Sequence, residues 1–190
     1  MQRIYPVEIL PEVYLEQNAH KKVQPEKHCA SCFKAARLHR HGTYLRWITS
    51  STGIAIRILI VRFLCPLCGV TLSYLPDFAL SYRLVNAQSV QRFIDGDTQA
   101  VDVQRWHRVL QGYWRKILRF FPTVVCVVGR SFGWSLPLKL PIAEAIKKAC
   151  GSFTAATRQL VSDFAMTWFA RYQCHQSPKR PRFISTSLEP

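Results

Sequence analysis

Two runs of strand-forming residues in the first half of the chain form its clearest local pattern. Residues 54–63 are rich in β-branched and apolar side chains and predict a strand, and residues 42–48 predict another strand before it. Residues 49–53 are Thr, Ser, Ser, Thr and Gly, a composition typical of a turn. The pattern therefore predicts a long β-hairpin.

Downstream of the hairpin the pattern predicts helices. Residues 86–96 predict a short helix with Asn86 as its N-cap and Gly96 as its stop. A second helix is predicted from about residue 98 or 102 to Phe121, where Pro122 ends it. One broad side of this helix is apolar and is expected to lie in the core: Trp106, Val109, Leu110, Tyr113, Trp114, Ile117, Phe120 and Phe121.

The last third of the chain predicts a small helical bundle. The apolar run at residues 124–128 is either a buried strand or the end of the long helix. Pro141 suits the first position of a helix that runs to Cys150. Ser152 then caps a last predicted helix over residues 153–172.

Four cysteines flank the predicted hairpin in two CxxC pairs. Cys29 and Cys32 precede it, and Cys65 and Cys68 follow it. Two such pairs provide the tetrahedral thiolate shell that Zn²⁺ prefers, and the hairpin would bring them together. The alternatives are four unrelated buried cysteines or a redox CxxC motif, although no βαβ pattern surrounds either pair. The sequence therefore predicts a Zn²⁺ site.

These patterns predict an α+β protein in which an N-terminal zinc ribbon is followed by a small helical bundle. The ribbon is expected over residues 28–80, and a helical region over residues 81–174. Residues 1–27 are expected to form a polar lead-in, with a short edge strand at residues 7–10. Residues 175–190 are expected to be a disordered basic tail.

The charge balance narrows the classes of partner. The chain has 190 residues, 26 Lys and Arg against 11 Asp and Glu, and a net charge of +15. Such a chain attracts polyanions, with nucleic acid as the first candidate and an anionic membrane surface as the alternative. No apolar run approaches the length of a membrane span, and the N-terminus lacks a signal-peptide pattern, so a cytoplasmic protein is expected.

Two groups of cationic residues are candidate phosphate contacts. The first begins after Cys32 and continues along the hairpin: Lys34, Arg37, His39, Arg40, His41, Arg46, Arg57 and Arg62. The second lies opposite the apolar side of the long helix: Arg105, Arg108, Arg115, Lys116 and Arg119. Each group is either a solvated face or a nucleic-acid-binding surface.

Several motifs carry a family resemblance over roughly residues 28–95. They are Cys29-x-x-Cys32, Leu38-His39-Arg40-His41-Gly42-Thr43-Tyr44-x-Arg46, Arg62-Phe63-x-Cys65-Pro66-x-Cys68-Gly69 and Leu75-Pro76-Asp77-Phe78. This region resembles the N-terminal zinc ribbon of bacterial insertion-sequence transposases, and a related uncharacterised family of small bacterial zinc-ribbon proteins. The resemblance implies zinc and DNA binding, without the strand-transfer chemistry of a separate catalytic domain.

The region after the ribbon also resembles the helix-turn-helix of those transposases, through Val103-Gln104-Arg105-Trp106. Only residues 97–101 separate the first helix from this motif, whereas a standard three-helix unit needs another helix there. Base readout by Gln104 or Arg105 is one hypothesis.

The expected function is non-catalytic binding of nucleic acid, DNA rather than RNA, in a bacterial cytoplasm and at the nucleoid. The few acidic residues do not form the converging carboxylates that metal-dependent strand transfer requires. The alternatives are a protein-interaction module, with a protein partner or self-association through the helical region, and a transposase remnant without activity.

Overall fold

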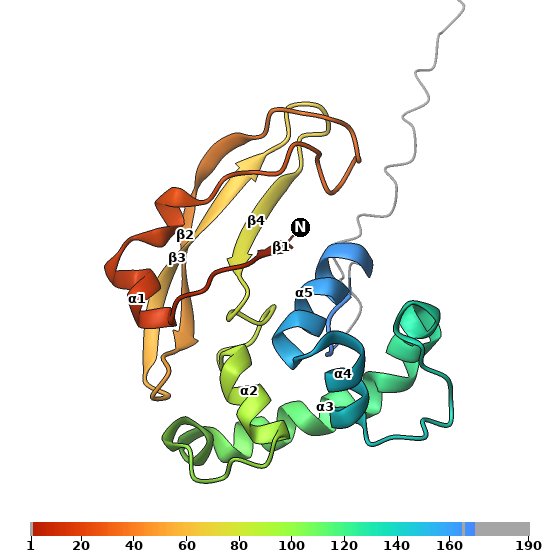
Figure 1. Ribbon diagram of the computed structural model, residues 1–190. Coiled ribbons are helices and arrows are strands. Elements are labelled where there is room, and N and C mark those ends of the chain that lie inside the picture. Colours follow the sequence, from red (N-terminus) through yellow and green to blue (C-terminus); the bar gives the residue numbers. More distant parts are fainter. Residues whose placement is uncertain (1, 165, 170–190) are drawn as a thin grey trace, which may run out of the picture.

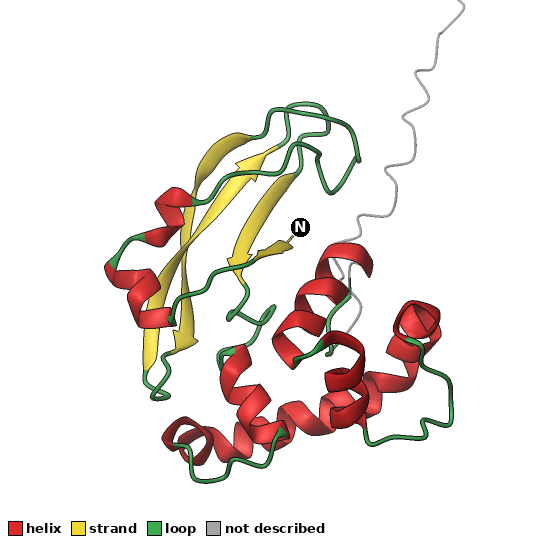
Figure 2. Ribbon diagram, in the orientation of Figure 1, coloured by secondary structure: helices red, strands yellow, loops and turns green. Residues whose placement is uncertain are grey.

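The computed structural model describes residues 2–164 and 166–169 and has the mixed α+β composition that the sequence predicts (Figure 1, Figure 2). Its elements follow in the order β1 (Gln2–Tyr5), α1 (Pro11–Glu16), η1 (Ala19–Lys22), β2 (His39–Thr49), β3 (Ala55–Leu64), β4 (Thr71–Pro76), α2 (Ala87–Ile94), α3 (Val101–Phe132), α4 (Ile142–Cys150) and α5 (Phe153–Phe164). None of the described helices is both long and apolar enough to cross a lipid bilayer.

The predicted hairpin is confirmed, but it is part of a larger sheet. Strands β2 and β3 pair antiparallel with Tyr44 opposite Ile60 and with His39 opposite Leu64. The sheet continues through β4, antiparallel to β3, to β1, which is parallel to β4, in the order β1-β4-β3-β2. A two-stranded ribbon would leave its apolar residues in water, which explains why more strands are recruited.

The N-terminal segment differs from the prediction. The short edge strand expected at residues 7–10 is wrong, because the strand that pairs is β1, at Gln2–Tyr5. The following helix α1 and the 3₁₀ turn η1 lie against β3, and Tyr14 donates a hydrogen bond to the Leu59 carbonyl at 3.2 Å. Residues 1–27, expected as a polar lead-in, therefore supply one strand and part of the covering of the sheet.

The core of the sheet continues into the helices. Ile48, Ile58 and Ile60 are fully buried and share a cluster with Ile4 and Leu75 and with Val161 of α5. A second cluster under the helices centres on α3 and includes residues of α2, α4 and α5. Helix α5 therefore contributes Val161 to the core of the sheet, while the helices also form an apolar cluster of their own.

The helix α3 is much longer than predicted. Its expected end at Phe121 is wrong, because the helix continues through Pro122 to Phe132. Val124 and Val128 are buried in the helical core, so burial outweighs the lost backbone hydrogen bond at proline. Of the two interpretations of residues 124–128, the end of the long helix is confirmed.

The other helices agree with the prediction in position. Helix α2 is capped by Asn86, whose side chain accepts a hydrogen bond from the Ser89 N–H. Pro141 takes the N-cap of α4 rather than its first turn, and α5 ends at Phe164. The predicted continuation of this helix to residue 172 is wrong over residues 166–169, which are not helical, and residues 170–172 and the expected tail at residues 175–190 lie outside the described residues.

Candidate metal centre and basic surfaces

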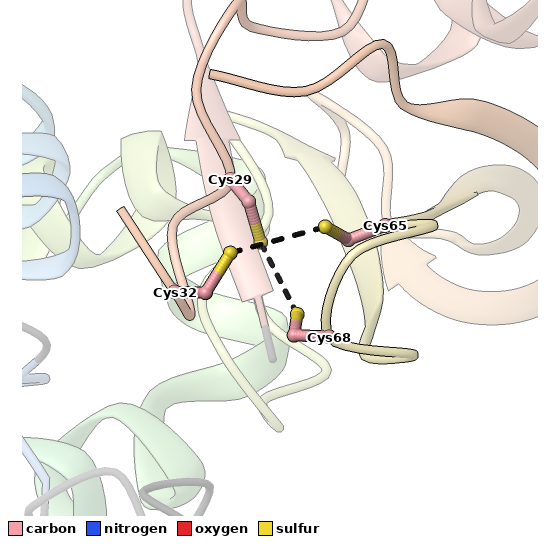
Figure 3. A group of neighbouring side chains, drawn as sticks. All are labelled: Cys29, Cys32, Cys65 and Cys68. Atoms are coloured by element: carbon pink, nitrogen blue, oxygen red, sulfur yellow. Dashed lines mark hydrogen bonds between the residues drawn. The ribbon is translucent and has the colours of Figure 1, made fainter. Parts of the chain in front are cut away.

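The four cysteines converge at one end of the sheet. Cys29 and Cys32 lie before β2, whereas Cys65 and Cys68 lie in the turn between β3 and β4. The pairing of His39 with Leu64 brings these two segments together. The four Sγ atoms point at one another and lie within 4.8 Å of one another (Figure 3).

The spacing of the sulfur atoms matches a tetrahedral metal site. Sγ of Cys29 lies 3.7 Å from Sγ of Cys68, and Sγ of Cys32 lies 4.0 Å from Sγ of Cys65. A zinc ion bound by four thiolates at about 2.3 Å requires sulfur atoms about 3.8 Å apart. Zn²⁺ therefore fits this cluster, and the four residues would hold it.

The two cysteine turns have the same backbone hydrogen bonds. The Cys29 N–H donates to the Lys34 carbonyl at 3.0 Å, and the Cys65 N–H donates to the Val70 carbonyl at 3.0 Å. The residue after each pair, Phe33 or Gly69, donates its N–H back to the carbonyl of the first cysteine at 2.8 or 2.9 Å. Each CxxC segment is thus a closed turn that aims both thiols inward.

The two turns place different residue types at the same left-handed backbone position. Gly69 has φ of +68°, and Phe33, at the equivalent position, has φ of +58°. Glycine adopts this conformation freely, whereas for other L-residues it costs roughly 1–2 kcal/mol. The first turn is therefore strained at Phe33.

The protonation of the thiols differs within the cluster. Burial raises the pKa of Cys29 to about 12, despite N–H donors from Cys32 and Ser31. Burial also acts on Cys65, but N–H groups of Cys68 and Leu67 outweigh it and lower the pKa of this thiol to about 7. A divalent cation would favour the ionised form of all four thiols, since each thiolate then faces a positive charge.

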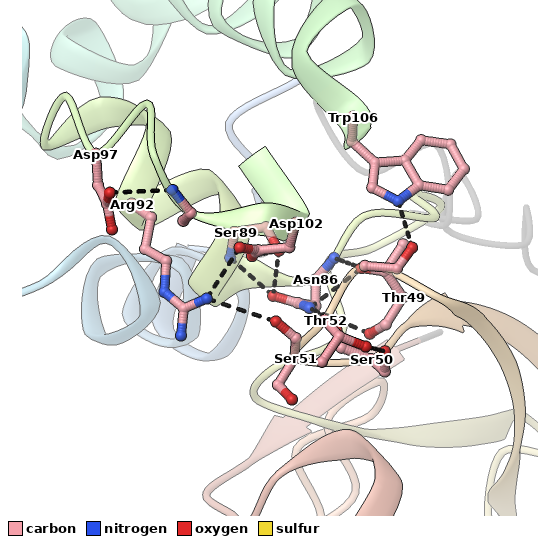
Figure 4. A network of polar contacts seen from close by, with 12 residues as sticks. Thr49, Ser50, Ser51, Thr52, Asn86, Ser89, Arg92, Asp97, Asp102 and Trp106 are labelled. Carbon is pink, nitrogen blue, oxygen red and sulfur yellow. Dashed lines mark hydrogen bonds and ion pairs between the residues drawn. The ribbon is translucent and has the colours of Figure 1, made fainter. Parts of the chain in front are cut away.

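A buried polar network joins the tip of the hairpin to the helices (Figure 4). The Asn86 side-chain amide donates to the carbonyls of Thr49 and Ser50 at 3.1 and 2.9 Å. Its carbonyl oxygen accepts from the Ser89 N–H and hydroxyl at 2.8 and 3.1 Å. The N-cap of α2 thus also holds the end of β2.

The same network reaches α3. Asp102, which is 1% exposed, accepts from the Ser89 hydroxyl and from Arg92. The Trp106 indole N–H donates to the Gly53 carbonyl at 2.6 Å, at a residue where α3 departs from helical geometry. Sheet and α3 are therefore held in a fixed orientation.

The candidate phosphate contacts on α3 lie together on its exposed face. Arg105, Arg108, Arg115, Lys116 and Arg119 are all exposed. Among the described residues, none of these five forms an ion pair, since the ion pairs there are Arg3–Glu26 and Arg92–Asp102. The expected division of α3 into an apolar side and a basic side is present, with Leu110, Ile117 and Phe121 buried opposite, but Val109, predicted to lie in the core, is exposed.

The candidate contacts on the hairpin are not equally available. Lys34, Arg37, His39 and His41 are exposed, and Arg57 is exposed with its guanidinium 5.2 Å from the centre of the Trp47 ring. The remaining three are engaged with the fold itself: Arg40 binds carbonyls of His20 and Lys21, Arg46 binds carbonyls of Leu80 and Arg83, and Arg62 lies over the Tyr44 ring.

Acidic residues are absent from the two segments of the sequence that carry the candidate phosphate contacts. Residues 27–76 contain no Asp or Glu, and residues 103–143 contain none either. Every candidate phosphate contact lies in one of these two segments. The absence of acids from these two segments therefore indicates where the candidate phosphate contacts lie, whereas the number of cations in the chain does not.

The comparisons with known proteins give one match. Residues 29–110 match a family described as Domain of unknown function (DUF6431). No curated protein and no solved structure matches the chain. The matched segment begins at the first cysteine of the cluster and ends in α3 beyond Trp106, so it contains both the cluster and the polar junction.

Proposed function

We propose that this chain is a zinc-dependent nucleic-acid-binding protein, with DNA rather than RNA as its ligand and without catalytic activity. The four cysteines would hold Zn²⁺ and fix the end of the sheet, while exposed cations bind phosphate. The face of α3 carries this proposal, because its five cations are exposed and unpaired with acids in the part of the chain that the structure describes.

The size of the α3 face suits a nucleic-acid backbone. Arg108 and Arg119, both after the kink at Trp106, are 11 positions apart, which corresponds to about 16 Å along a helix at 1.5 Å per residue. This distance equals about five base pairs of duplex DNA. Gly112 lies within the face, and a Cβ there would meet open space, so a phosphate can approach the helix backbone closely.

The proposed ancestry is that of bacterial insertion-sequence transposases, and the metal-bound hairpin would be their zinc ribbon. It rests on the cysteine, arginine and phenylalanine motifs of the sequence. Asp97 and Asp102 are engaged in a turn and in the buried junction, which favours a structural role for both. Such a protein would act in the bacterial cytoplasm, at the nucleoid.

A matched pair of double variants tests the proposal. Arg115 and Lys116 are adjacent exposed cations on α3, and Lys147 and Lys148 are adjacent exposed cations on α4. Changing either pair to Gln removes two charges. Each phosphate contact contributes about 0.9 to the slope of log affinity against log salt.

We expect the α3 pair to reduce the salt slope for duplex DNA by about 1.8 and the α4 pair to leave it nearly unchanged. Equal effects of the two pairs would show that net charge, and not the α3 face, attracts DNA. Affinity that does not fall as salt rises would reject phosphate binding altogether.

A second candidate is a protein-interaction module, which a different surface favours. Strand β2 is at the edge of the sheet, and Leu45, Trp47 and Ile54 near the hairpin tip are each 55% exposed. Light scattering tests this candidate, because concentration-dependent dimers that Leu45→Lys abolishes would assign the edge to self-association.

A further inference from the structure

Phe33 combines a strained backbone with an exposed aromatic ring. It takes the position that glycine takes in the second cysteine turn, in the left-handed region. Its side chain is 80% exposed, so packing does not offset the strain. A glycine at this position would fold more easily, which indicates that the ring serves something other than the stability of the turn.

The surroundings of Phe33 are cationic. The adjacent Lys34 and the nearby Lys27 and Arg37 are exposed. The two sides of this turn are held together, because residue 28 bridges to residue 35 and the Ala36 N–H donates to the Lys27 carbonyl at 3.1 Å. The aromatic ring therefore projects from a rigid loop, and the acid nearest to it in sequence, Glu26, is paired with Arg3 at 2.7 Å.

We propose that Phe33 stacks on an unpaired nucleic-acid base while Lys27, Lys34 and Arg37 bind the flanking phosphates. This inference rests on the proposed function and adds a preference for single-stranded or partly opened nucleic acid. An aromatic ring stacks on any base, whereas cations beside it hold the backbone without reading sequence. The positive charge around the ring favours this ligand over an apolar protein surface.

The test uses the full chain with zinc and compares Phe33→Gly with two control variants. Phe33→Trp retains an aromatic ring, and Leu67→Ala removes an exposed apolar side chain, 59% exposed, from the second cysteine turn. Fluorescence anisotropy measures affinity for a 20-nucleotide oligo-dT strand and for a 20-base-pair duplex. Metal content and Tm are measured for each variant.

We expect Phe33→Gly to weaken binding to the single strand by about 5- to 150-fold, as stacking of 1–3 kcal/mol per base requires. Duplex affinity and metal content should stay within twofold, and Tm should not fall, since glycine relieves the strain. Phe33→Trp and Leu67→Ala should bind the single strand as the wild type does.

The outcomes separate this inference from the proposed function. A wild-type protein that binds neither probe rejects both. Wild-type binding that Phe33→Gly leaves unchanged on the single strand overturns the role of Phe33 alone. An equal loss on both probes, or an equal loss in Leu67→Ala, also overturns it, because stacking on an unpaired base predicts neither. If Phe33→Gly instead abolishes self-association and leaves nucleic-acid affinity intact, the ring belongs to a protein contact and the inference is rejected.

Discussion

Replacing Asn86 with Ala should separate the sheet from the helices at the junction in Figure 4. The Asn86 side chain is completely buried and bonds both to β2 and to the first turn of α2. The substitution removes the N-cap of α2, which is worth about 0.5–2 kcal/mol. It also takes the amide donor from the buried carbonyls of Thr49 and Ser50, of which the Ser50 carbonyl keeps the Gly53 N–H at 3.1 Å.

The loss of those partners sets the expected magnitude. Each buried polar group left unsatisfied costs about 1–3 kcal/mol, although water entering the gap would recover part of it. Because the Ser50 carbonyl retains the Gly53 N–H, we expect Asn86→Ala to lower the free energy of unfolding by about 2–4 kcal/mol in total. Ser152→Ala is the matched control, because Ser152 caps α5 by accepting the Ala155 N–H at 3.0 Å and makes no bond to the sheet.

Urea denaturation followed by circular dichroism measures both variants. Ser152→Ala should cost about 1 kcal/mol, the value of a cap alone. If Asn86→Ala costs no more than this control, the carboxamide does not hold the sheet to the helices, and the rigid junction inferred here is wrong.

Three further predictions concern the metal, the glycines and pH. A chelator, or Cys65→Ser, should remove zinc and unfold the hairpin, which circular dichroism would detect as a loss of signal. The control Cys126→Ser changes an exposed thiol outside the cluster and should keep full metal. A Cys65→Ser protein that stays folded and metal-loaded would refute the site. Gly53→Ala should lower Tm, because its Cβ would lie 2.9 Å from a Cα atom of α3 at a φ of +78°. Gly112→Ala, where the added Cβ would meet open space on the helix, should instead stabilise the protein by about 1 kcal/mol. A Tm that is higher for Gly53→Ala than for Gly112→Ala would contradict the packing at the hairpin tip. Burial and two neighbouring cations, Lys21 and Arg40, lower the pKa of His20. Its contribution to the free energy of unfolding should therefore be fully present above about pH 6.5 and be lost as the pH falls below that value. His20→Phe should flatten this pH dependence of stability, and an unchanged dependence would exclude His20 as its source.

Local patterns in the sequence determined several features of this protein. The turn at residues 49–53 between two strand-forming runs fixed the hairpin, and Asn86 marked the start of α2, because turns and caps depend on residues close in the chain. The spacing of Cys29, Cys32, Cys65 and Cys68 predicted a joint cluster, since a hairpin must bring both its ends together.

Other features were decided only by contacts between distant residues. The pairing of β1 with β4 and the passage of α3 through Pro122 follow from burial that no local pattern contains. Asp102 resembles an ordinary turn or capping acid in sequence, yet the fold buries it against Ser89 and Arg92. The positive φ of Phe33 is likewise decided by the folded turn, because a backbone dihedral angle does not follow from the residue type alone.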